Sequence, residues 1–303
     1  MKVLVVVDKP YWAYASIFHS LDKYNTTDVD MTMIPVKGKQ DKIRGMSKKY
    51  DLFFVMGWQL YELVRFLPQD LTITGIHSAH SFAKDTTPEQ DVEPPQKIVD
   101  YLNGFLRVNA VSGRLCDLFK RNGVDKIHHT SNGVDSELFV PKARDPNSTF
   151  SVGYSGSKNH DWRKGVSEFI IPSAEKAGVA TKIAMLSTGS YIPLDEMPTF
   201  YQALDAYICA SSSEGFSLSV LEAASCGVPV ITTRVGGCTE LIKDGENGFL
   251  VDRNVDAIAD RIVALKNDDE LRDRISKAIR KTVEDKYCWK HRAGDWFDFI
   301  LDK

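Results

Sequence analysis

The sequence is poor in the residues that mark secreted, metal-binding or membrane-spanning proteins. It has only five cysteines among 303 residues, and none stands in C-x-x-C spacing. An odd number of scattered cysteines argues against a disulfide framework or a zinc site and indicates reduced thiols in a cytoplasmic protein. No apolar run approaches the roughly 20 residues of a membrane span, and we expect MKVLVVVDKP at the amino end to be a first strand rather than a signal peptide.

An excess of charge of one sign is also lacking. The 38 basic and 41 acidic residues give a formal net charge of −3, which argues against the strongly basic surface of a nucleic-acid-binding protein. A local exception is the segment 37–49, where six Lys or Arg residues stand against one Asp. This run predicts a solvated face, with weak peripheral contact to an anionic membrane as the alternative.

What the chain does contain is an alternation of short apolar runs and amphipathic segments, which is typical of a parallel α/β protein. The expected strands are 2–7, 29–36, 51–56, 71–77, 107–111, 126–131, 149–154, 181–187, 206–209 and 228–231. A turn, an Asx-type cap and a proline stop mark a linker at 131–141. We therefore expect a doubly wound domain at 1–143, a second one at 144–286, and a helix within 287–303 that packs back on the first domain.

The most informative stretch runs from 207 to 251 and contains two strand–turn–helix units in tandem. Their polar, glycine-containing turns lie at 211–215 and at 236–237. Because parallel strands end at one edge of a sheet, we expect both turns at that edge. Helix N-termini there favour anions such as phosphate.

Two glutamates in this stretch, Glu214 in the first turn and Glu222 in the helix, are eight positions apart. With a rise of about 1.5 Å per helical residue, they lie roughly 6–8 Å apart along the axis, close to the gap between a ribose and the group beyond its diphosphate. Glu222 could accept from both ribose hydroxyls, and Glu214 could reach whatever the diphosphate carries. The alternative is structural, because Ser219 and Glu222 have the spacing of a capping box.

The run EGFSLSVLE, followed by GVPVITTRVGGCTELI and DGENGFLV, resembles the nucleotide-binding signature of the retaining GT-B glycosyltransferases of family 4. In that family the E-x7-E pair, the GVPV strand and the GG-x-x-E turn line the donor site. The resemblance implies an α/β protein with two Rossmann-like doubly wound domains that face each other across a cleft. It implies donor contacts at Glu214, Gly215, Phe216, Ser217, Glu222, Gly236 and Gly237.

The loop after the expected strand 149–154 resembles the family's loop with two diphosphate-binding cations. Lys164 stands in a K-G pair, like one of them. Lys158 is our candidate for the other, because it lies at the matching distance from Lys164 and a lysine binds phosphate as a point charge. Arg163 is a third candidate.

His77 follows the expected strand 71–77, in a position similar to the family's histidine that points at the transferred sugar. A neutral imidazole there could donate to a sugar hydroxyl without changing its charge. His80 is the second candidate. The pair also has the form H-x-x-H, but no carboxylate or cysteine stands nearby to complete a metal site.

The resemblance implies a retaining glycosyltransferase that moves a hexose-type sugar from a nucleotide diphosphate sugar to a hydroxyl acceptor, which could be a carbohydrate, a lipid or another molecule. UDP-sugar is the favoured donor and GDP-sugar the second choice. No D-x-D motif lies in a suitable loop, so we expect no metal and no other cofactor, with Lys158, Lys164 and the helix N-termini stabilising the leaving diphosphate. Glu214 and His77 complete the expected catalytic set. A sugar-nucleotide 2-epimerase and a non-catalytic nucleotide-sugar-binding module stay open as alternatives.

Overall fold

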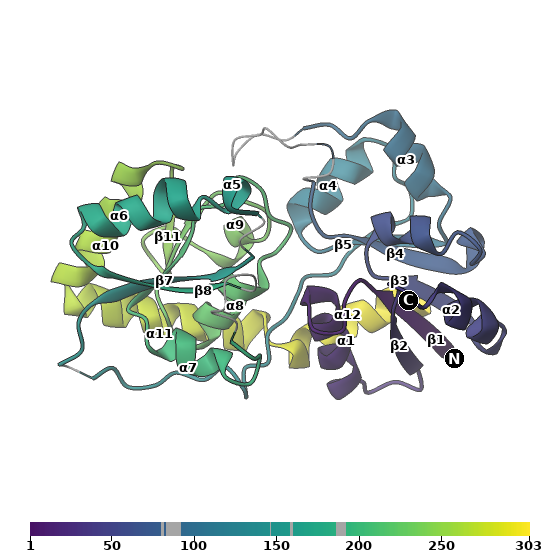
Figure 1. Cartoon of the computed structure of the whole chain (residues 1–303), viewed down its shortest axis with the longest axis horizontal. Helices are drawn as coiled ribbons and strands as arrows, with labels where there is room; N and C mark the ends of the chain where they lie inside the picture. Colours follow the sequence, from purple (N-terminus) through teal and green to yellow (C-terminus); the bar gives the residue numbers. More distant parts are fainter. Residues whose placement is uncertain (80–81, 83–91, 146, 158–159, 186–191) are drawn as a thin grey trace. The chain divides into compact units, whose positions relative to one another are not determined.

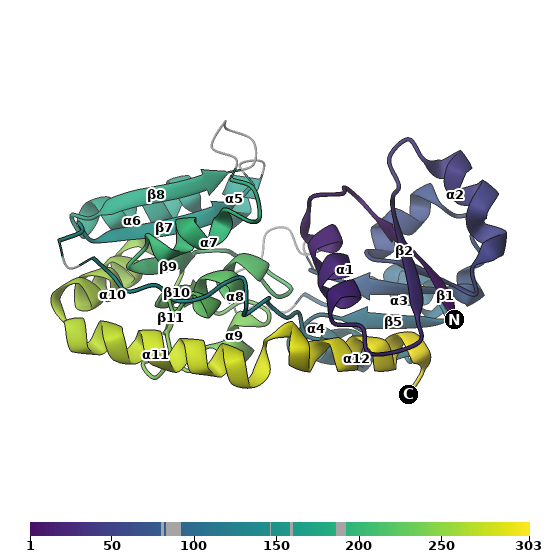
Figure 2. The same cartoon turned by 90° about the horizontal axis from the view of Figure 1, so that it is seen from below.

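The computed structural model describes residues 1–79, 82, 92–145, 147–157, 160–185 and 192–303, which form two units. Of the described residues, those up to 133 and those from 289 onward belong to the first unit, and those from 134 to 288 belong to the second. Each unit is a parallel sheet with helices on both sides (Figures 1 and 2). The boundary expected at 143/144 lies slightly further along the chain than this division.

The first unit contains a parallel sheet with the strand order β2-β1-β3-β4-β5-β6. Its strands are β1 (Lys2–Val7), β2 (Asp30–Pro35), β3 (Leu52–Val55), β4 (Thr72–Ile76), β5 (Arg107–Ala110) and β6 (Ile127–His129). Its helices are α1 (Ala13–Lys23), α2 (Gln40–Met46), η1 (Ser47–Lys49), η2 (Trp58–Leu63), η3 (Gln69–Leu71), α3 (Gln96–Asn103), α4 (Gly113–Arg121) and α12 (Trp289–Leu301). Helices α1 and α12 cover one face of the sheet, and α3 and α4 cover the other (Figure 1).

The central strands of this sheet are apolar on both sides because helices cover both faces. In β1 the residues from Val3 to Val7 are at most 1% exposed, and β3 is buried along its whole length. Continuous apolar runs of this kind are the pattern of a doubly covered parallel sheet, which is why the sequence predicted these strands.

The C-terminal helix α12 is fixed to the first unit by two side chains. The guanidinium of Arg107 donates to the Phe299 carbonyl oxygen at 3.0 Å and to the Ile300 carbonyl oxygen at 2.9 Å. These carbonyls belong to the last turn, where helical acceptors lack an intrahelical partner, so the arginine caps the helix. The fully buried indole of Trp296 donates to the Ser131 carbonyl oxygen at 2.9 Å.

The basic run at 37–49 occupies α2, η1 and the turn before them. Each of its six basic side chains is on an exposed residue. Arg44 of this run lies over the ring of Phe66, 4.0 Å from its centroid. No helix in the described part of the chain is long and apolar enough to cross a membrane.

The second unit contains a parallel sheet with the strand order β11-β10-β9-β7-β8. Its strands are β7 (Ser151–Gly156), β8 (Ala180–Met185), β9 (Ala206–Cys209), β10 (Val230–Thr233) and β11 (Phe249–Val251). Its helices are α5 (Asp161–Lys164), η5 (Val166–Ile170), α6 (Ile171–Lys176), α7 (Met197–Gln202), α8 (Leu218–Ser225), α9 (Cys238–Leu241), α10 (Val255–Asn267) and α11 (Asp269–Lys286). Helices α6 and α10 lie on one side of the sheet, and α7, α8 and α11 lie on the other (Figure 1).

The linker that follows residue 133 belongs to the second unit because Arg280 of α11 holds it there. The guanidinium donates to the carbonyl oxygens of Ser136 at 3.1 Å and Phe139 at 2.8 Å. It also donates to the carbonyl oxygen of Ser225, at the end of α8. A single partly buried cation therefore joins the linker to two helices, which explains why the units separate before the linker rather than after it.

Candidate functional site

The site is built where β7 and β9 lie side by side in the sheet of the second unit. From β7 the chain runs outward to β8, and from β9 it runs in the opposite direction through β10 to β11. In open α/β sheets, ligands bind at the carboxyl ends of the strands at such a switch point. The loop after β7 carries Arg163 and Lys164, and the loop after β9 carries Glu214.

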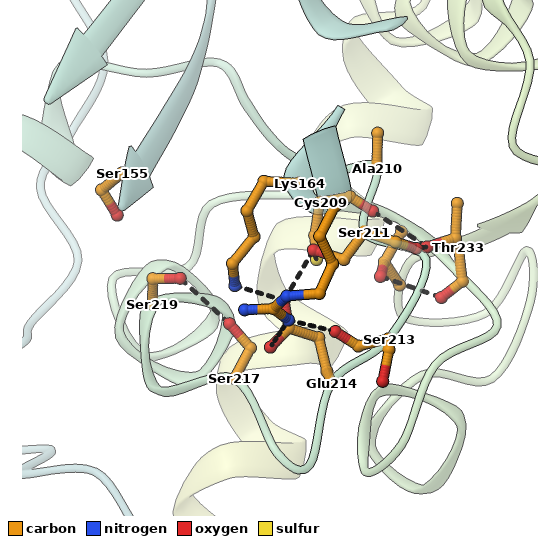
Figure 3. Close-up of polar contacts among 12 residues, drawn as sticks. Ser155, Lys164, Cys209, Ala210, Ser211, Ser213, Glu214, Ser217, Ser219 and Thr233 are labelled. Atoms are coloured by element: carbon orange, nitrogen blue, oxygen red, sulfur yellow. Dashed lines mark hydrogen bonds and ion pairs between the residues drawn. The ribbon is translucent and has the colours of Figure 1, made fainter. Parts of the chain in front are cut away.

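Three side chains from these two loops converge on the carboxylate of Glu214 (Figure 3). Lys164 Nζ forms an ion pair with Oε1, and Arg163 Nη1 lies 3.5 Å from Oε2. The Ser211 hydroxyl donates to Oε1 at 2.6 Å. The Glu214 side chain is 9% exposed and that of Lys164 is 16% exposed, so water screens this cluster only weakly.

The charge of Glu214 follows from these contacts. Burial alone would raise the pKa of the carboxyl group, but the charges of Lys164 and Arg163 outweigh burial and lower the pKa to about 2. Glu214 is therefore ionised at any pH near neutrality. Its two cations are held in place before a ligand arrives.

Arg253 joins the loop after β7 to the loop after β9. Its Nε donates to the Ala210 carbonyl oxygen at 2.8 Å, and its Nη2 donates to the Arg163 carbonyl oxygen at 3.2 Å. The two loops also bond directly, because the Ser212 amide donates to the Arg163 carbonyl oxygen at 2.9 Å. These bonds fix the backbone on which Lys164 and Glu214 stand.

The second glycine turn packs directly on the first. Gly236 has a left-handed φ of +42°, and a Cβ there would lie 2.1 Å from the Gly215 carbonyl oxygen. A Cβ at Gly237 would lie 2.3 Å from the ring of Phe216, and the Gly237 amide donates to the Gly215 carbonyl oxygen at 2.7 Å. These contacts require glycine at both positions.

One expectation about this second turn needs correction. The helix it opens, α9, is a single turn, and the amides of Gly237, Cys238, Thr239 and Glu240 all donate to backbone carbonyl oxygens. Its macrodipole is small and these amides are engaged, so the turn does not offer a row of free donors to an anion. What the structure shows for Gly236 and Gly237 is close packing. The ring of Phe216 is likewise a buried packing group, 5.4 Å from the ring of Tyr287.

The helix that follows the first turn, α8, begins without a side-chain cap. Its N-cap residue, Ser217, makes no capping bond, because its hydroxyl pairs with that of Ser219 at 3.0 Å (Figure 3). The first amides of a helix have no intrahelical acceptor. A helix start of this kind is suited to an anion.

Glu222 lies inside α8 and makes no capping box. The N-cap of the helix is Ser217, so Ser219 lies within the helix and the alternative interpretation of the pair fails. The carboxylate of Glu222 instead accepts from the Tyr201 hydroxyl at 2.7 Å. Burial raises the pKa of Glu222 to about 7, against a smaller lowering by the Tyr201 hydrogen bond.

Comparison with known proteins agrees with this geometry. Residues 165–282 match the family described as glycosyl transferases group 1. The second unit is therefore similar to this family over most of its length.

Two curated relatives match parts of this chain. The chain is 31% identical over 184 residues to the capsular polysaccharide biosynthesis glycosyltransferase CapM of Staphylococcus aureus. This alignment covers 52% of this chain and 48% of that protein. It is 32% identical over 121 residues to a D-inositol 3-phosphate glycosyltransferase of Corynebacterium urealyticum, covering 40% of this chain and 28% of that protein. The matches thus span about half, or less, of these relatives.

Solved structures resemble the whole chain. Sucrose-phosphate synthase of Thermosynechococcus elongatus has a TM-score of 0.78 at 16% identity, covering 99% of this chain and 98% of that one. HepE of Anabaena, in complex with UDP and glucose, has a TM-score of 0.75 at 17% identity, covering 100% of both chains. The fold of this chain is therefore GT-B, with one Rossmann-like domain in each unit, as the sequence predicted.

His77 lies in the first unit, directly after β4. Its ring packs edge-on against Tyr14, with 4.6 Å between ring centroids, and its Nε2 has no hydrogen-bond partner among the described residues. A Cβ at Gly75 would lie 2.6 Å from Nε2 and 2.8 Å from Asn109 Oδ1. Burial lowers the pKa of His77 to about 4, so the imidazole is neutral at neutral pH.

The remaining expected site residues divide into two groups. Lys158 and His80 lie outside the described residues. Arg163, the third candidate cation, forms an ion pair with Glu214. Its Nε is buried without a hydrogen-bond partner in the described part of the chain. Sequence reasoning missed Tyr201 altogether, since no spacing or motif relates this residue to Glu222. In the described residues, no group of three or more His, Cys, Asp or Glu side chains is arranged to hold a metal ion.

Proposed function

We propose that this protein is a retaining glycosyltransferase that moves a hexose-type sugar from a nucleotide diphosphate sugar to a hydroxyl acceptor without a metal ion. The observation that carries the proposal is the meeting of Lys164 and Arg163 with Glu214 at the switch point of the second sheet. Buried cations at that edge suit a diphosphate, and the ionised carboxylate beside them suits sugar hydroxyls.

In this mechanism Lys164 binds the diphosphate and stabilises the charge that develops on it as the glycosidic bond breaks. The start of α8 adds backbone amides on the same side, next to Ser217. Preorganised donors of this kind contribute about 3–4 kcal/mol each to transition-state stabilisation. Lys158 is proposed as a further cation from its spacing alone.

Two carboxylates orient the donor in our proposal. Glu214 accepts from hydroxyls of the transferred sugar, and it is not assigned as a covalent nucleophile. Glu222 accepts from the ribose hydroxyls. His77 is proposed to donate to the transferred sugar as a neutral imidazole, a charge state that its lowered pKa supports.

The donor base follows from analogy rather than from a contact. HepE of Anabaena was solved with UDP and glucose and also with UDP-glucose, and TarM of S. aureus was solved with UDP. These proteins share the fold, which supports UDP-sugar as the first donor to test and GDP-sugar as the second. The acceptor is proposed only as a hydroxyl-bearing carbohydrate, lipid or other molecule. A cytoplasmic site of action is part of the proposal, and the exposed basic run could add weak peripheral membrane contact.

Incubation of the purified protein with UDP- and GDP-sugars, with and without EDTA, tests this function. We expect slow hydrolysis, or transfer to added acceptors, that survives EDTA and yields the anomer with retained configuration. Inversion at C2 would instead identify a 2-epimerase, and tight binding without turnover would identify a sensing module. Loss of turnover in EDTA would overturn the metal-independent mechanism.

A pair of matched variants shows whether the activity belongs to this site. Glu214→Gln removes the charge that Lys164 and Arg163 face, and we expect it to abolish most of the turnover. Glu246→Gln makes the same change on an exposed side chain beside Lys243 and should leave turnover unchanged. Equal rates in the two variants would exclude Glu214 from the reaction.

A further inference from the structure

The carboxylate of Glu222 stands at one end of a series of hydroxyl groups. The Tyr201 hydroxyl donates to Glu222 Oε2 at 2.7 Å, and Ser155 Oγ lies 2.8 Å from the Tyr201 hydroxyl oxygen. The Tyr207 hydroxyl lies 3.2 Å from Ser155 Oγ. We call these four residues the hydroxyl chain. Both of its tyrosines are 0% exposed, so water does not compete for these bonds.

Counting protons gives the direction of each hydrogen bond in the hydroxyl chain. An ionised Glu222 can only accept, so the one proton of the Tyr201 hydroxyl goes to it, and the Tyr201 oxygen then accepts from Ser155 Oγ. The Ser155 amide donates to the Tyr207 oxygen at 3.2 Å, the Ser219 side chain is a further partner of this hydroxyl, and the Ser155 carbonyl and hydroxyl oxygens can accept the Tyr207 proton. Two hydrogen bonds therefore fix the Tyr201 hydroxyl, one on each side.

The hydroxyl chain connects Glu222 to the strands that carry the other half of the site. Ser155 lies in β7 just before the loop with Lys164, and Tyr207 lies in β9 just before the turn with Glu214. Tyr201 comes from α7, which packs against α8. The carboxylate of Glu222 is thus held relative to the same two strands that position Lys164 and Glu214.

We propose that Tyr201 is a positioning residue that favours the ionised form of Glu222 and orients its carboxylate to accept from the ribose hydroxyls of a bound nucleoside diphosphate. This inference rests on the proposed function, because it takes Glu222 as the ribose-binding residue. A hydroxyl at 2.7 Å has the length of a charge-assisted hydrogen bond to a carboxylate. It opposes the burial that raises the pKa of Glu222.

The other titratable groups around Glu222 do not take over this role. Tyr207 of β9 bonds to Ser155, as described above. Cys226, at the end of α8, is neutral because burial raises its pKa to about 12. Arg280 of α11 is engaged by the carbonyl oxygens of Ser225 and of the linker. Of these groups in the described part of the chain, Tyr201 is therefore the one that donates to the Glu222 carboxylate.

Tyr201→Phe removes only the hydroxyl and keeps the ring. Binding of UDP and GDP, and of their 2′,3′-dideoxy analogues, would be measured by calorimetry between pH 6 and pH 9. The ratio of the ribose and dideoxyribose affinities cancels the titration of the phosphate. We expect the pH at which the wild-type protein gains its preference for ribose to rise by about one unit in the variant, with about fivefold less preference near pH 7.

Tyr154→Phe is the matched control. Tyr154 is 2% exposed and stacks on Tyr207, but its hydroxyl has no hydrogen-bond partner within the described residues. Like Tyr201→Phe, this variant removes one buried tyrosine hydroxyl, but it leaves the hydrogen bonds of the hydroxyl chain in place. The preference for ribose over dideoxyribose should therefore not change. Ser155→Ala, which removes the donor to Tyr201, should give a smaller loss than Tyr201→Phe.

Three results decide the inference. An unchanged ribose preference and pH profile in Tyr201→Phe would overturn it, and so would an equal loss in Tyr154→Phe, which would indicate packing alone. If wild-type protein binds neither UDP nor GDP, the proposed function fails. The pH dependence of unfolding of the ligand-free protein then still tests the hydroxyl chain, since Tyr201→Phe should move the titration of Glu222 upward by about one pH unit.

Discussion

Replacing Glu222 by Gln should stabilise the protein at alkaline pH and weaken nucleotide binding at the same time. Burial raises the pKa of Glu222 from 4.5 to about 7 in the folded protein. Below pH 4.5 the group is protonated in both the folded and the unfolded chain and has no effect on their balance. Between pH 4.5 and about pH 7 the unfolded chain releases this proton while the folded protein keeps it, so stability falls as the pH rises and the full cost is reached above about pH 7.

The magnitude follows from the size of this shift. A pKa difference of one unit corresponds to 1.36 kcal/mol, so the shift of Glu222 costs the wild-type protein about 3 kcal/mol above pH 8. Part of this cost is already present at pH 5, where the unfolded chain is largely ionised. Between pH 5 and pH 8 the wild-type protein should therefore lose about 2–3 kcal/mol more than Glu222→Gln does. The Gln carbonyl oxygen can still accept from Tyr201, so the variant keeps that hydrogen bond.

Urea titrations of both proteins at pH 5 and pH 8 measure this difference. Glu246→Gln, with the same change on an exposed side chain, corrects for general effects of charge. A pH-independent difference between Glu222→Gln and wild type would refute the burial argument. Stabilisation at pH 8 with undiminished nucleotide binding would instead leave the burial argument intact and remove Glu222 from the ribose site.

Two further predictions test the diphosphate site and the packing of its turns. Lys164→Met should weaken binding of nucleoside diphosphates about 10- to 100-fold and leave binding of the nucleoside unchanged, whereas Lys176→Met, at an exposed lysine paired with Asp256, should affect neither. Equal losses for nucleoside and diphosphate would exclude a phosphate contact. Gly237→Ala should destabilise the protein by about 1–3 kcal/mol in urea because its Cβ would meet the Phe216 ring. Gly294→Ala, on an open face of α12, should stabilise the protein by about 0.5–1 kcal/mol. Changes of the same sign in the unfolding free energies of the two variants would contradict the packing argument.

The elements that the sequence predicted well are those with a strong local pattern. The strand at 206–209 has the same bounds in the structure as in the sequence analysis, and the helix expected within 287–303 runs from Trp289 to Leu301. Both contain a continuous apolar run or a complete amphipathic repeat, which fixes their type locally. Short turns such as η2 (Trp58–Leu63) and α5 (Asp161–Lys164) were not predicted, because they span too few residues to show a period.

The spatial grouping of the candidate residues was predictable where a motif holds them close together in sequence. Glu214 and Gly215 lie within one stretch, and the structure places them at one sheet edge with Gly236. Tyr201 could not be found in this way, because its contact with Glu222 joins residues 21 positions apart in different helices. Tertiary packing alone brings such pairs together. The same reason explains why amide engagement in the second turn became visible only in the structure.

The charge states of the two glutamates lead to a final prediction about proton release. Glu214 and Glu222 belong to one motif, yet cations lower the pKa of the first to about 2 and burial raises that of the second to about 7. A ribose that donates to Glu222 requires the ionised form, so nucleotide binding near pH 7 should release about half a proton. Calorimetry in buffers of different ionisation enthalpy measures this number, and Glu222→Gln serves as the subtraction. An identical buffer dependence in both proteins would mean that Glu222 does not titrate on binding, and the ribose contact would have to be abandoned.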